Sequence, residues 1–419
     1  MEQHFETPMN FDAVKDGKTD ATGVIVAALN YAHTNGIADV TFPPGDYLLT
    51  GTQSIHLYSD TFYRMDGARF IVRHNTAELF YVFEMENACN TKIIGGEIIG
   101  DPDWSRHNLD RFAANTKDYI NIGGLHIHGG GTENVEVKGF AARDLTAAGI
   151  LVISRDERPV CGVRIIDCNI VRASPNYADY LTEKPPGALA GEDWDPRANI
   201  FVTTAGDVKI TDCTAAESHC DGITLEKCKN ASLTDCAATD QHMGGIVLIG
   251  GRDITIKNCS AKGNGSRGFT VEAECENASL TNCKAAANGR EGCWIDRGCQ
   301  AITLTDINFT ENGRKSDLVS TATYPGNKTA HIRITNGHSG QKNTGITITD
   351  CRFTTYNQLC SVEVEADSLE GGPVMIAGCT VELLPKTGLP DYPARESVKF
   401  EQHINAQAGD VVLSGNTRI

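Results

Sequence analysis

The first candidates for chemistry in this 419-residue chain are three acidic residues, Glu226, Glu272 and Asp296, and one tryptophan, Trp294. Glu272 lies 24 residues before Asp296, and Glu226 lies 46 residues before Glu272. Two carboxyl groups about 5 Å apart can cleave a glycosidic bond, one as acid and the other as nucleophile. Trp294 offers an apolar ring of the kind that stacks on a sugar. Carbohydrate chemistry therefore requires a fold that brings residues of this spacing together.

A repeat of 23 or 24 residues predicts such a fold. Each copy contains a Gly-apolar-x-apolar strand, a short turn and a second strand, as in GITLEKCKNASLTDC and GIVLIGGRDITIKNC. A fixed period in this range is typical of stacked repeat proteins, in which equivalent positions lie about 5 Å apart. The period is marked by two series of positions, Cys213, Cys236, Cys259 and Cys283, and Cys228, Gly251, Cys275 and Cys299.

The segment NFDAVKDGKTDATGVIVAALNYAHTNGIADVTFPPGDYLLTG is the most specific part of the chain. We expect Asp20 or Thr22 to cap a helix over about 23–33. Short strands are expected at 40–42 and 47–49. The predicted apolar stripe of the helix consists of Val24, Ala27, Ala28 and Tyr31.

This segment resembles the N-terminal signature of the pectate lyase and polygalacturonase superfamily. In that superfamily the helix caps a right-handed parallel β-helix. The resemblance implies an all-β fold, a right-handed parallel β-helix (solenoid) with a short N-terminal amphipathic helix. We expect the cap at 1–50 and the β-helix at 51–419, together forming one structural domain.

Loop insertions interrupt the repeat near 101–120, 172–198 and 313–330, and an irregular stretch lies near 381–396. The first three precede the Gly-apolar-x-apolar strand of their coil. Insertions into one turn of a solenoid collect along one edge, which is often the binding side. We expect a groove along the outer face of that strand, with Trp194 among its wall residues. Alternatively, the insertions cover apolar surface or mediate oligomerisation.

Strand alternation assigns the outer face of each coil. Ile223 and Leu225 are expected to point inward, so Thr224 and Glu226 point outward. The same register places these further pairs outward: His126 and His128, Leu151 and Ile153, Phe201 and Thr203, Val247 and Ile249, Thr270 and Glu272, Trp294 and Asp296, Arg333 and Thr335, and Glu363 and Glu365. The turn just before the strand carries Ala148, Asp221, Gly244, Arg267 and Glu291.

Four acids, three on this face and Asp221 at its edge, are the candidate catalytic residues: Asp221, Glu226, Glu272 and Asp296. Glu272 and Asp296 fall on adjacent coils, near the carboxyl separation of a retaining glycosidase. Glu226 and Glu272 are two coils apart, at or beyond the limit for an inverting pair. An isolated surface acid is the simpler interpretation of Glu363 and Glu365. The candidate substrate-binding residues are Arg267, Trp294, Phe201, His242, His128, Arg333 and Trp194.

The resemblance to polygalacturonases is limited at their catalytic motifs. His219-Cys220-Asp221-Gly222-Ile223 matches the Asp-Gly-Ile of the first motif. Met243-Gly244 stands where that family has an Asp pair, and Ser266-Arg267-Gly268 where it has Gly-His-Gly. Its Arg-Ile-Lys motif is absent unless residues 331–334, His-Ile-Arg-Ile, are a distant substitute. Only Asp221 carries over, so the resemblance does not imply an inverting mechanism on galacturonan.

Three functions fit these patterns. The first is a glycoside hydrolase-like enzyme that cleaves or rearranges glycosidic bonds of a poly- or oligosaccharide. The second is a uronan lyase or C5-epimerase, in which Arg267 acts on a uronate while His219, His242 or His128 serves as acid or base. Its support is generic, because the turns NGSRGF and NGREGC resemble those of mannuronan epimerases but the Asp-Pro-His-Glu motif is absent. The third is a phage tailspike or adhesin that binds glycans, usually as a trimer.

Composition limits the partners. The net charge of −17 argues against nucleic acid and anionic membranes. The expected partner is a poly- or oligosaccharide, and the protein is expected to be a monomer or a homotrimer. No cofactor and no metal site are predicted. The first twenty residues contain no signal peptide, so an extracellular or periplasmic location is expected if a signal was removed, and a cytoplasmic one otherwise.

Two residue types are expected to stack along the coils. Most of the fifteen cysteines are predicted to be reduced and buried in columns, where a free thiol behaves as a small apolar group. Acidic and amide residues before the turns are predicted to form a structural side-chain ladder. Its members are Asp167, Asp212, Asp235, Asn258, Asn282, Asp306 and Asp350.

Overall fold

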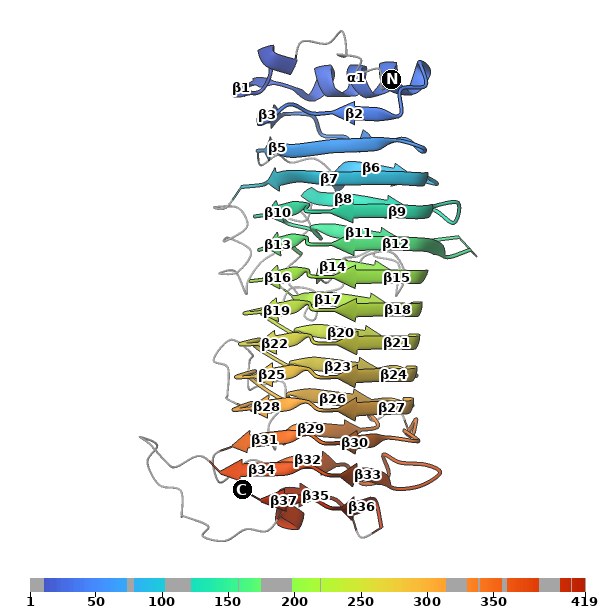
Figure 1. The fold of residues 1–419 in the computed structure, drawn as a ribbon, viewed down its shortest axis with the longest axis vertical. Coiled ribbons are helices and arrows are strands. Elements are labelled where there is room, and N and C mark those ends of the chain that lie inside the picture. Colours follow the sequence, from blue (N-terminus) through green and yellow to red (C-terminus); the bar gives the residue numbers. More distant parts are fainter. Residues whose placement is uncertain are drawn as a thin grey trace, which may run out of the picture. The chain divides into compact units, whose positions relative to one another are not determined.

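The computed structural model describes residues 11–73, 79–101, 122–156, 158–174, 198–218, 220–313, 330–337, 340–355, 360–383, 400–407 and 409–418. The chain divides into two compact units, Met1–Cys220 and Asp221–Ile419. Within each unit, parallel strands pair from one coil to the next (Figure 1). The predicted all-β parallel β-helix is therefore confirmed. No helix in the described ranges has the length and apolar character needed to cross a membrane.

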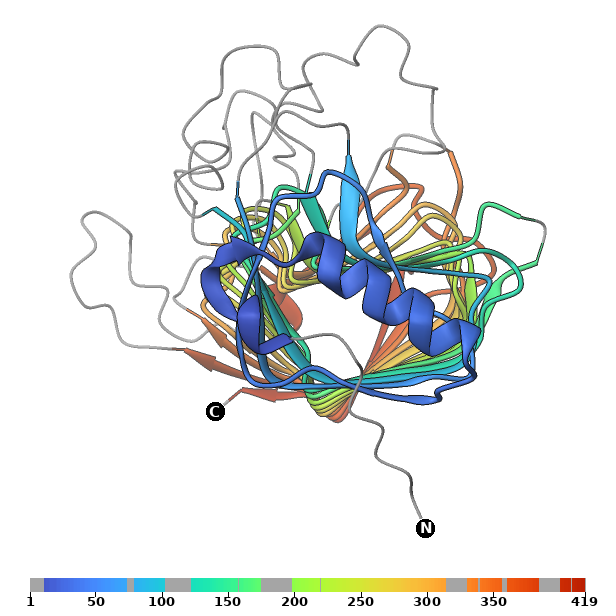
Figure 2. The same cartoon turned by 90° about the horizontal axis from the view of Figure 1, so that it is seen from above.

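The first unit begins with the expected helix, α1, at Thr22–Thr34. Figure 2 shows this helix lying across the end of the first coils. Ala21 is the N-cap and makes no side-chain cap bond, so the predicted cap residue was wrong. Asp20 still stabilises the start of the helix, because its carboxylate accepts a hydrogen bond from the Thr22 amide at 3.1 Å.

The buried stripe of α1 also differs from the prediction. Its members are Ile25, Ala28, Leu29 and Ala32, whereas Tyr31 is 41% exposed. Of the predicted stripe only Ala28 is correct. The physical reason is that this helix of 13 residues can present either of two adjacent stripes, and the one containing Ile25 and Leu29 buries the larger aliphatic side chains.

The first unit contains one sheet that carries the candidate site residues, here called the site sheet, and further strands that complete each coil. Its site sheet contains β4 (Ile55–His56), β6 (Phe80–Glu86), β8 (Ile122–His128), β11 (Ile150–Ile153) and β14 (Ala198–Thr203). The other elements are η1 (Phe11–Ala13), β1 (Asp16–Asp20), β2 (Asp39–Thr41), β3 (Gly45–Leu49), β5 (Phe62–Val72), β7 (Cys89–Ile99), β9 (Glu133–Lys138), β10 (Ala141–Arg143), β12 (Val160–Ile166), β13 (Asn169–Val171), β15 (Ala205–Thr211) and β16 (Thr214–Ala216).

The second unit repeats the same coil. Its site sheet contains β17 (Asp221–Glu226), β20 (Ile246–Ile249), β23 (Phe269–Glu272), β26 (Cys293–Asp296), β29 (Ala330–Thr335), β32 (Cys360–Val364) and β35 (Ile404–Asn405). The other elements are β18 (Lys229–Thr234), β19 (Ala237–Thr239), β21 (Arg252–Lys257), β22 (Ser260–Lys262), β24 (Glu276–Thr281), β25 (Lys284–Ala286), β27 (Gln300–Thr305), β28 (Asn308–Thr310), β30 (Thr347–Thr349), β31 (Arg352–Thr355), β33 (Val374–Ala377), β34 (Thr380–Leu383), η3 (Phe400–His403), β36 (Val411–Ser414) and β37 (Thr417–Arg418).

The glycine at the start of the repeat is required for steric reasons. A Cβ on Gly245 would lie 2.6 Å from the carbonyl oxygen of Gly268, and one on Gly268 would lie 2.6 Å from that of Gly292. These oxygens accept hydrogen bonds from Ile246 and Phe269, so the coils approach closely here. Any larger residue would push neighbouring coils apart at the start of the site sheet.

The predicted turn ladder is confirmed by side-chain hydrogen bonds at three of its members, Asp235, Asn258 and Asn282. All seven of its members have positive φ, between 52° and 57°. This left-handed conformation is one that Asp and Asn adopt more readily than other non-glycine residues. In the second unit, Asn258 donates to Asp235 at 2.9 Å and Asn282 donates to Asn258 at 2.8 Å.

A second amide ladder, absent from the sequence predictions, lies inside the second unit. Asn264 donates to Asn288 at 2.8 Å, and Asn288 donates to Asn312 at 2.7 Å. All three residues are buried. The ladder satisfies amide groups within the core that would otherwise lose their hydrogen bonds to water.

The predicted cysteine columns are also confirmed. All fifteen cysteines are free, and twelve of them are buried. Cys236, Cys259 and Cys283 directly precede the paired strands β19, β22 and β25, so they occupy successive coils. The predicted insertions near 101–120, 172–198 and 313–330, and the irregular stretch near 381–396, lie largely outside the described residues.

Candidate functional site

The outer face of the site sheet in the second unit has the predicted register. Glu272 is the strand partner of Asp296, and Thr270 is the partner of Trp294. The next strand places Arg333 beside Trp294 and Thr335 beside Asp296. The repeat spacing therefore brought the two carboxylates and the tryptophan onto adjacent strands.

Arg297 contacts both members of the carboxylate pair. Its guanidinium group pairs with Glu272, and its Nε lies 3.2 Å from Oδ2 of Asp296. The Asp296 side chain is 1% exposed, whereas the Glu272 side chain is 14% exposed. Burial raises the pKa of Asp296 above its ordinary value, and the charge of Glu272 adds to the rise, against the hydrogen bond from Thr335. The two acids thus occupy different electrostatic environments.

Trp294 is held by two contacts. The guanidinium carbon of Arg267 lies 3.6 Å from the centroid of the indole ring, a cation–π distance. The indole Nε1 donates to the Thr335 hydroxyl at 2.9 Å, and that hydroxyl donates to Asp296. The aromatic ring and the buried acid are therefore positioned by one shared threonine.

A buried carboxylate, Glu291, lies among three arginines. Arg267 approaches it at 3.2 Å, Arg290 at 3.5 Å and Arg333 at 3.8 Å. Arg333 also approaches Glu363 at 3.3 Å. Burial alone would raise the pKa of Glu291, but the three guanidinium groups outweigh burial and lower that pKa. Glu291 therefore holds the two candidate substrate-binding arginines, Arg267 and Arg333, in position by ion pairing.

Other predicted site residues lie on coils farther from the carboxylate pair, or bond to a backbone amide. Asp221 accepts a hydrogen bond from the Gly244 amide at 2.7 Å, which ties two turns together. Glu226 is separated from Glu272 by the strand that carries Ile249. His242 is partly buried, and burial lowers its pKa. The predicted residues Trp194 and His219 lie outside the described residues.

In the first unit, Phe201 belongs to an apolar cluster on the outer face of the site sheet. Its strand partner is Leu151, whose own partner on the preceding coil is His126. Phe201 is 4% exposed. The other members of the cluster are Tyr81, Ala147, Ala148, Leu151 and Ala198, with Ile153 packed against them.

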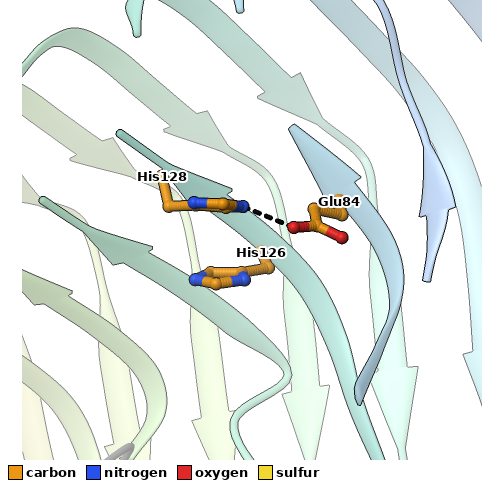
Figure 3. Close-up of side chains that lie close together, drawn as sticks. All are labelled: Glu84, His126 and His128. Carbon is orange, nitrogen blue, oxygen red and sulfur yellow. Dashed lines mark hydrogen bonds and ion pairs between the residues drawn. The ribbon is translucent and has the colours of Figure 1, made fainter. Parts of the chain in front are cut away.

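Next to this cluster the first unit brings together Glu84, His126 and His128 (Figure 3). Nε2 of His128 lies 2.6 Å from Oε1 of Glu84. The two imidazole rings stack with centroids 4.0 Å apart and planes 18° apart. Burial lowers the pKa of His126 to about 3, and the hydrogen bond from His128 lowers the pKa of Glu84.

Sequence reasoning placed both histidines on this face but missed Glu84. The alternation of FYVFEME, with Phe83 and Met85 inward, carries the signal. The insertion near 101–120 follows this strand and breaks the period, so Glu84 could not be aligned with His126 from spacing alone. The pairing of β6 with β8 makes them strand partners.

Comparison with known proteins agrees with this architecture. A family model described as "Right handed beta helix region" matches residues 193–336. The chain is a right-handed parallel β-helix. The mannuronan C-5 epimerase AlgE6 A-module of Azotobacter vinelandii is similar over 98% of each chain, with a TM-score of 0.63 and 14% identity. No curated protein matches the sequence.

Two further solved structures share the fold. The surface adhesin PfbA of Streptococcus pneumoniae is similar over 97% of this chain and 88% of its own, with a TM-score of 0.60 and 12% identity. The Dettilon tailspike protein gp208 is similar over 88% of this chain and 67% of its own, with a TM-score of 0.57 and 12% identity. At these identities the similarities establish the β-helix fold.

Proposed function

We propose that the protein is a carbohydrate-active enzyme that binds a poly- or oligosaccharide on the outer face of the site sheet in its second unit. It acts on a glycosidic bond with Glu272 and Asp296 as its carboxyl pair. The observation that carries this proposal is their register on adjacent strands, with Asp296 buried and Glu272 partly exposed beside Arg297. Two carboxyl groups in contrasting environments are the usual basis for separate acid and nucleophile roles.

The roles follow from the two environments. Asp296 has a raised pKa and so retains its proton to a higher pH, which suits the group that protonates the leaving oxygen. Glu272 suits the carboxylate that attacks the anomeric carbon or stabilises its positive charge. Trp294 and Arg267 would position the sugar beside them. The similarity to a mannuronan epimerase module supports a polysaccharide as the class of substrate.

The test uses isosteric amides. Glu272→Gln and Asp296→Asn are each expected to reduce the release of reducing ends from a polysaccharide panel by at least about 1,000-fold. Glu276→Gln is the matched control, because Glu276 also pairs with an arginine, Arg252, but on the neighbouring strand β24. The proposal fails if both amide variants cleave as fast as the control.

A uronan lyase or C5-epimerase is the second candidate, favoured by the arginines around Glu291. Arg267 and Arg333 could neutralise the carboxylate of a uronate sugar once substrate competes for them. A lyase product carries a new double bond and absorbs in the near ultraviolet, whereas a hydrolase product gives reducing ends without that absorption. Glycan binding without any product would instead indicate an adhesin-like or tailspike-like role, for which light scattering would report a monomer or a trimer.

A further inference from the structure

The group formed by Glu84, His126 and His128 in the first unit has the composition of a metal site. The two histidines are separated by one residue on β8, so strand alternation places both on the outer face. Glu84 is the strand partner of His126 on the preceding coil. One potential ligand atom from each of the three residues lies within 4.8 Å of the other two (Figure 3).

One polar atom of this group lacks a partner. Nε2 of His126 is buried and has no hydrogen bond among the described residues. The hydroxyl of Tyr81, whose ring centroid lies 4.8 Å from that of His126, is likewise buried without one. Buried polar atoms in folded proteins almost always have a partner, so each exception requires a specific explanation. A bound ion would contact His126 through the ring nitrogen that faces Glu84 and His128.

We propose that Glu84, His126 and His128 bind one divalent transition-metal ion, of the zinc class. Two imidazoles and one carboxylate form a donor set found in catalytic zinc sites and in other transition-metal centres. Imidazole nitrogen favours these ions over calcium and magnesium, which prefer oxygen. The hydrogen bond between His128 and Glu84 would be exchanged for two bonds to the metal.

The surroundings of the group agree with this proposal. Tyr81 and Leu151 form an apolar wall beside it, which limits access of water to the ligands. Three protein ligands would leave at least one coordination position open. The residues involved play no part in the function proposed for the second unit, so the two proposals stand or fall separately.

The test is a titration with Co²⁺ of full-length protein that has first been treated with a chelator. The expected result is one Co²⁺ per chain, with a visible ligand-field spectrum, displaced by one equivalent of Zn²⁺. Fifteen cysteines could compete, so the near-ultraviolet region matters: thiolate ligands add a sulfur-to-cobalt charge-transfer band, and the proposed site must lack it.

Three variants assign the ligands. Glu84→Gln, His126→Ala and His128→Ala are each expected to weaken Co²⁺ binding by at least about 100-fold. His33→Ala is the control, because His33 is an exposed histidine of the same unit that stacks on Tyr58. Zn²⁺ should raise the thermal midpoint of the wild type and of this control, and leave the midpoints of the ligand variants unchanged. Absence of stoichiometric binding by the wild type, a thiolate band, or undiminished binding by Glu84→Gln overturns the proposal.

Discussion

Arg267 lies against the ring of Trp294, with its guanidinium carbon 3.6 Å from the ring centroid, and it also pairs with Glu291. The contact joins the turn before β23 to the strand of the next coil. A cation is thus placed between an aromatic face and a buried carboxylate. The outer face of the second unit is therefore preorganised by interactions between coils as well as within them.

Removal of Arg267 is the first prediction. Arg267→Ala should lower the free energy of unfolding by about 2–3 kcal/mol, because the ring contact is lost and buried Glu291 keeps only two of its three cations. Arg267→Lys should recover part of this loss, since lysine keeps the charge but lacks the planar group. Urea denaturation measures both. Arg252→Ala, which breaks an exposed pair, should cost less than about 1 kcal/mol; equal losses for Arg252 and Arg267 would contradict the interpretation.

Glu291 predicts loss of stability in acid. Its pKa in the folded protein is lower than the ordinary value of 4.5, so the unfolded chain binds more protons between the two pKa values. The stabilisation is fully present above about pH 4.5 and is lost as the pH falls through the folded pKa. The measurement is the free energy of unfolding against pH for the wild type and Glu291→Gln. The gap between the two curves should narrow in acid, and a constant gap would count against the ion-pair explanation.

Asp296 predicts the opposite trend. Its folded pKa lies above the ordinary value of 3.8, so here the folded state binds more protons. Its contribution to stability is therefore greatest in acid and declines as the pH rises from 3.8 through the folded pKa. The free energy of unfolding of Asp296→Asn should rise relative to that of the wild type across that interval in the same denaturation series. If the free energy of unfolding of the variant falls relative to that of the wild type instead, the fold favours the ionised form of Asp296.

The internal amide ladder predicts a large effect at its centre. Asn288→Ala should cost about 2–4 kcal/mol, because buried Asn264 and Asn312 each lose a hydrogen-bond partner. Asn258→Ala is the comparison, since Asn258 also bonds to two neighbours but is exposed on the turn ladder. Its cost should be about 1 kcal/mol, mainly from the left-handed backbone. Thermal or urea unfolding of both variants checks the ranking.

Thiol titration tests the cysteine columns. Only Cys89, Cys161 and Cys360 are not fully buried, so at most three thiols of the native protein should react quickly with Ellman's reagent. Cys161 should be slow among these, because burial raises the pKa of its thiol. After denaturation without reductant all fifteen should react. Fewer than fifteen would reveal disulfides and refute the reduced columns.

Much of the second unit's outer face could be predicted from the sequence. Side chains alternate with period two and the coils repeat every 23 or 24 residues, so Glu272, Asp296 and Trp294 could be registered without any coordinates. Arg297 could not be foreseen as the residue between the two carboxylates. It follows the strand at a left-handed position, with φ of 56°, where strand alternation no longer sets the direction of a side chain.

Other features depend on interactions that a periodic pattern does not encode. Two adjacent stripes of α1 are both apolar, and tertiary packing selects the one that contains Ile25. Glu84 lies beside His126 because β6 pairs with β8, although the repeat is interrupted between these two strands. The candidate metal group therefore emerged only from the structure.

Gly222, Gly245, Gly268 and Gly292 each open a coil of the second unit and each lie close to a backbone oxygen of the next coil, so these coils can replace one another as modules in the same register. Glu226 and Glu272 are separated by a single such module, which carries Ile249. Excision of one 23-residue module would set these glutamates side by side and leave the cores above and below intact. Gain or loss of whole modules thus offers a route by which a solenoid can create new acid pairs without a substitution in the coils that remain.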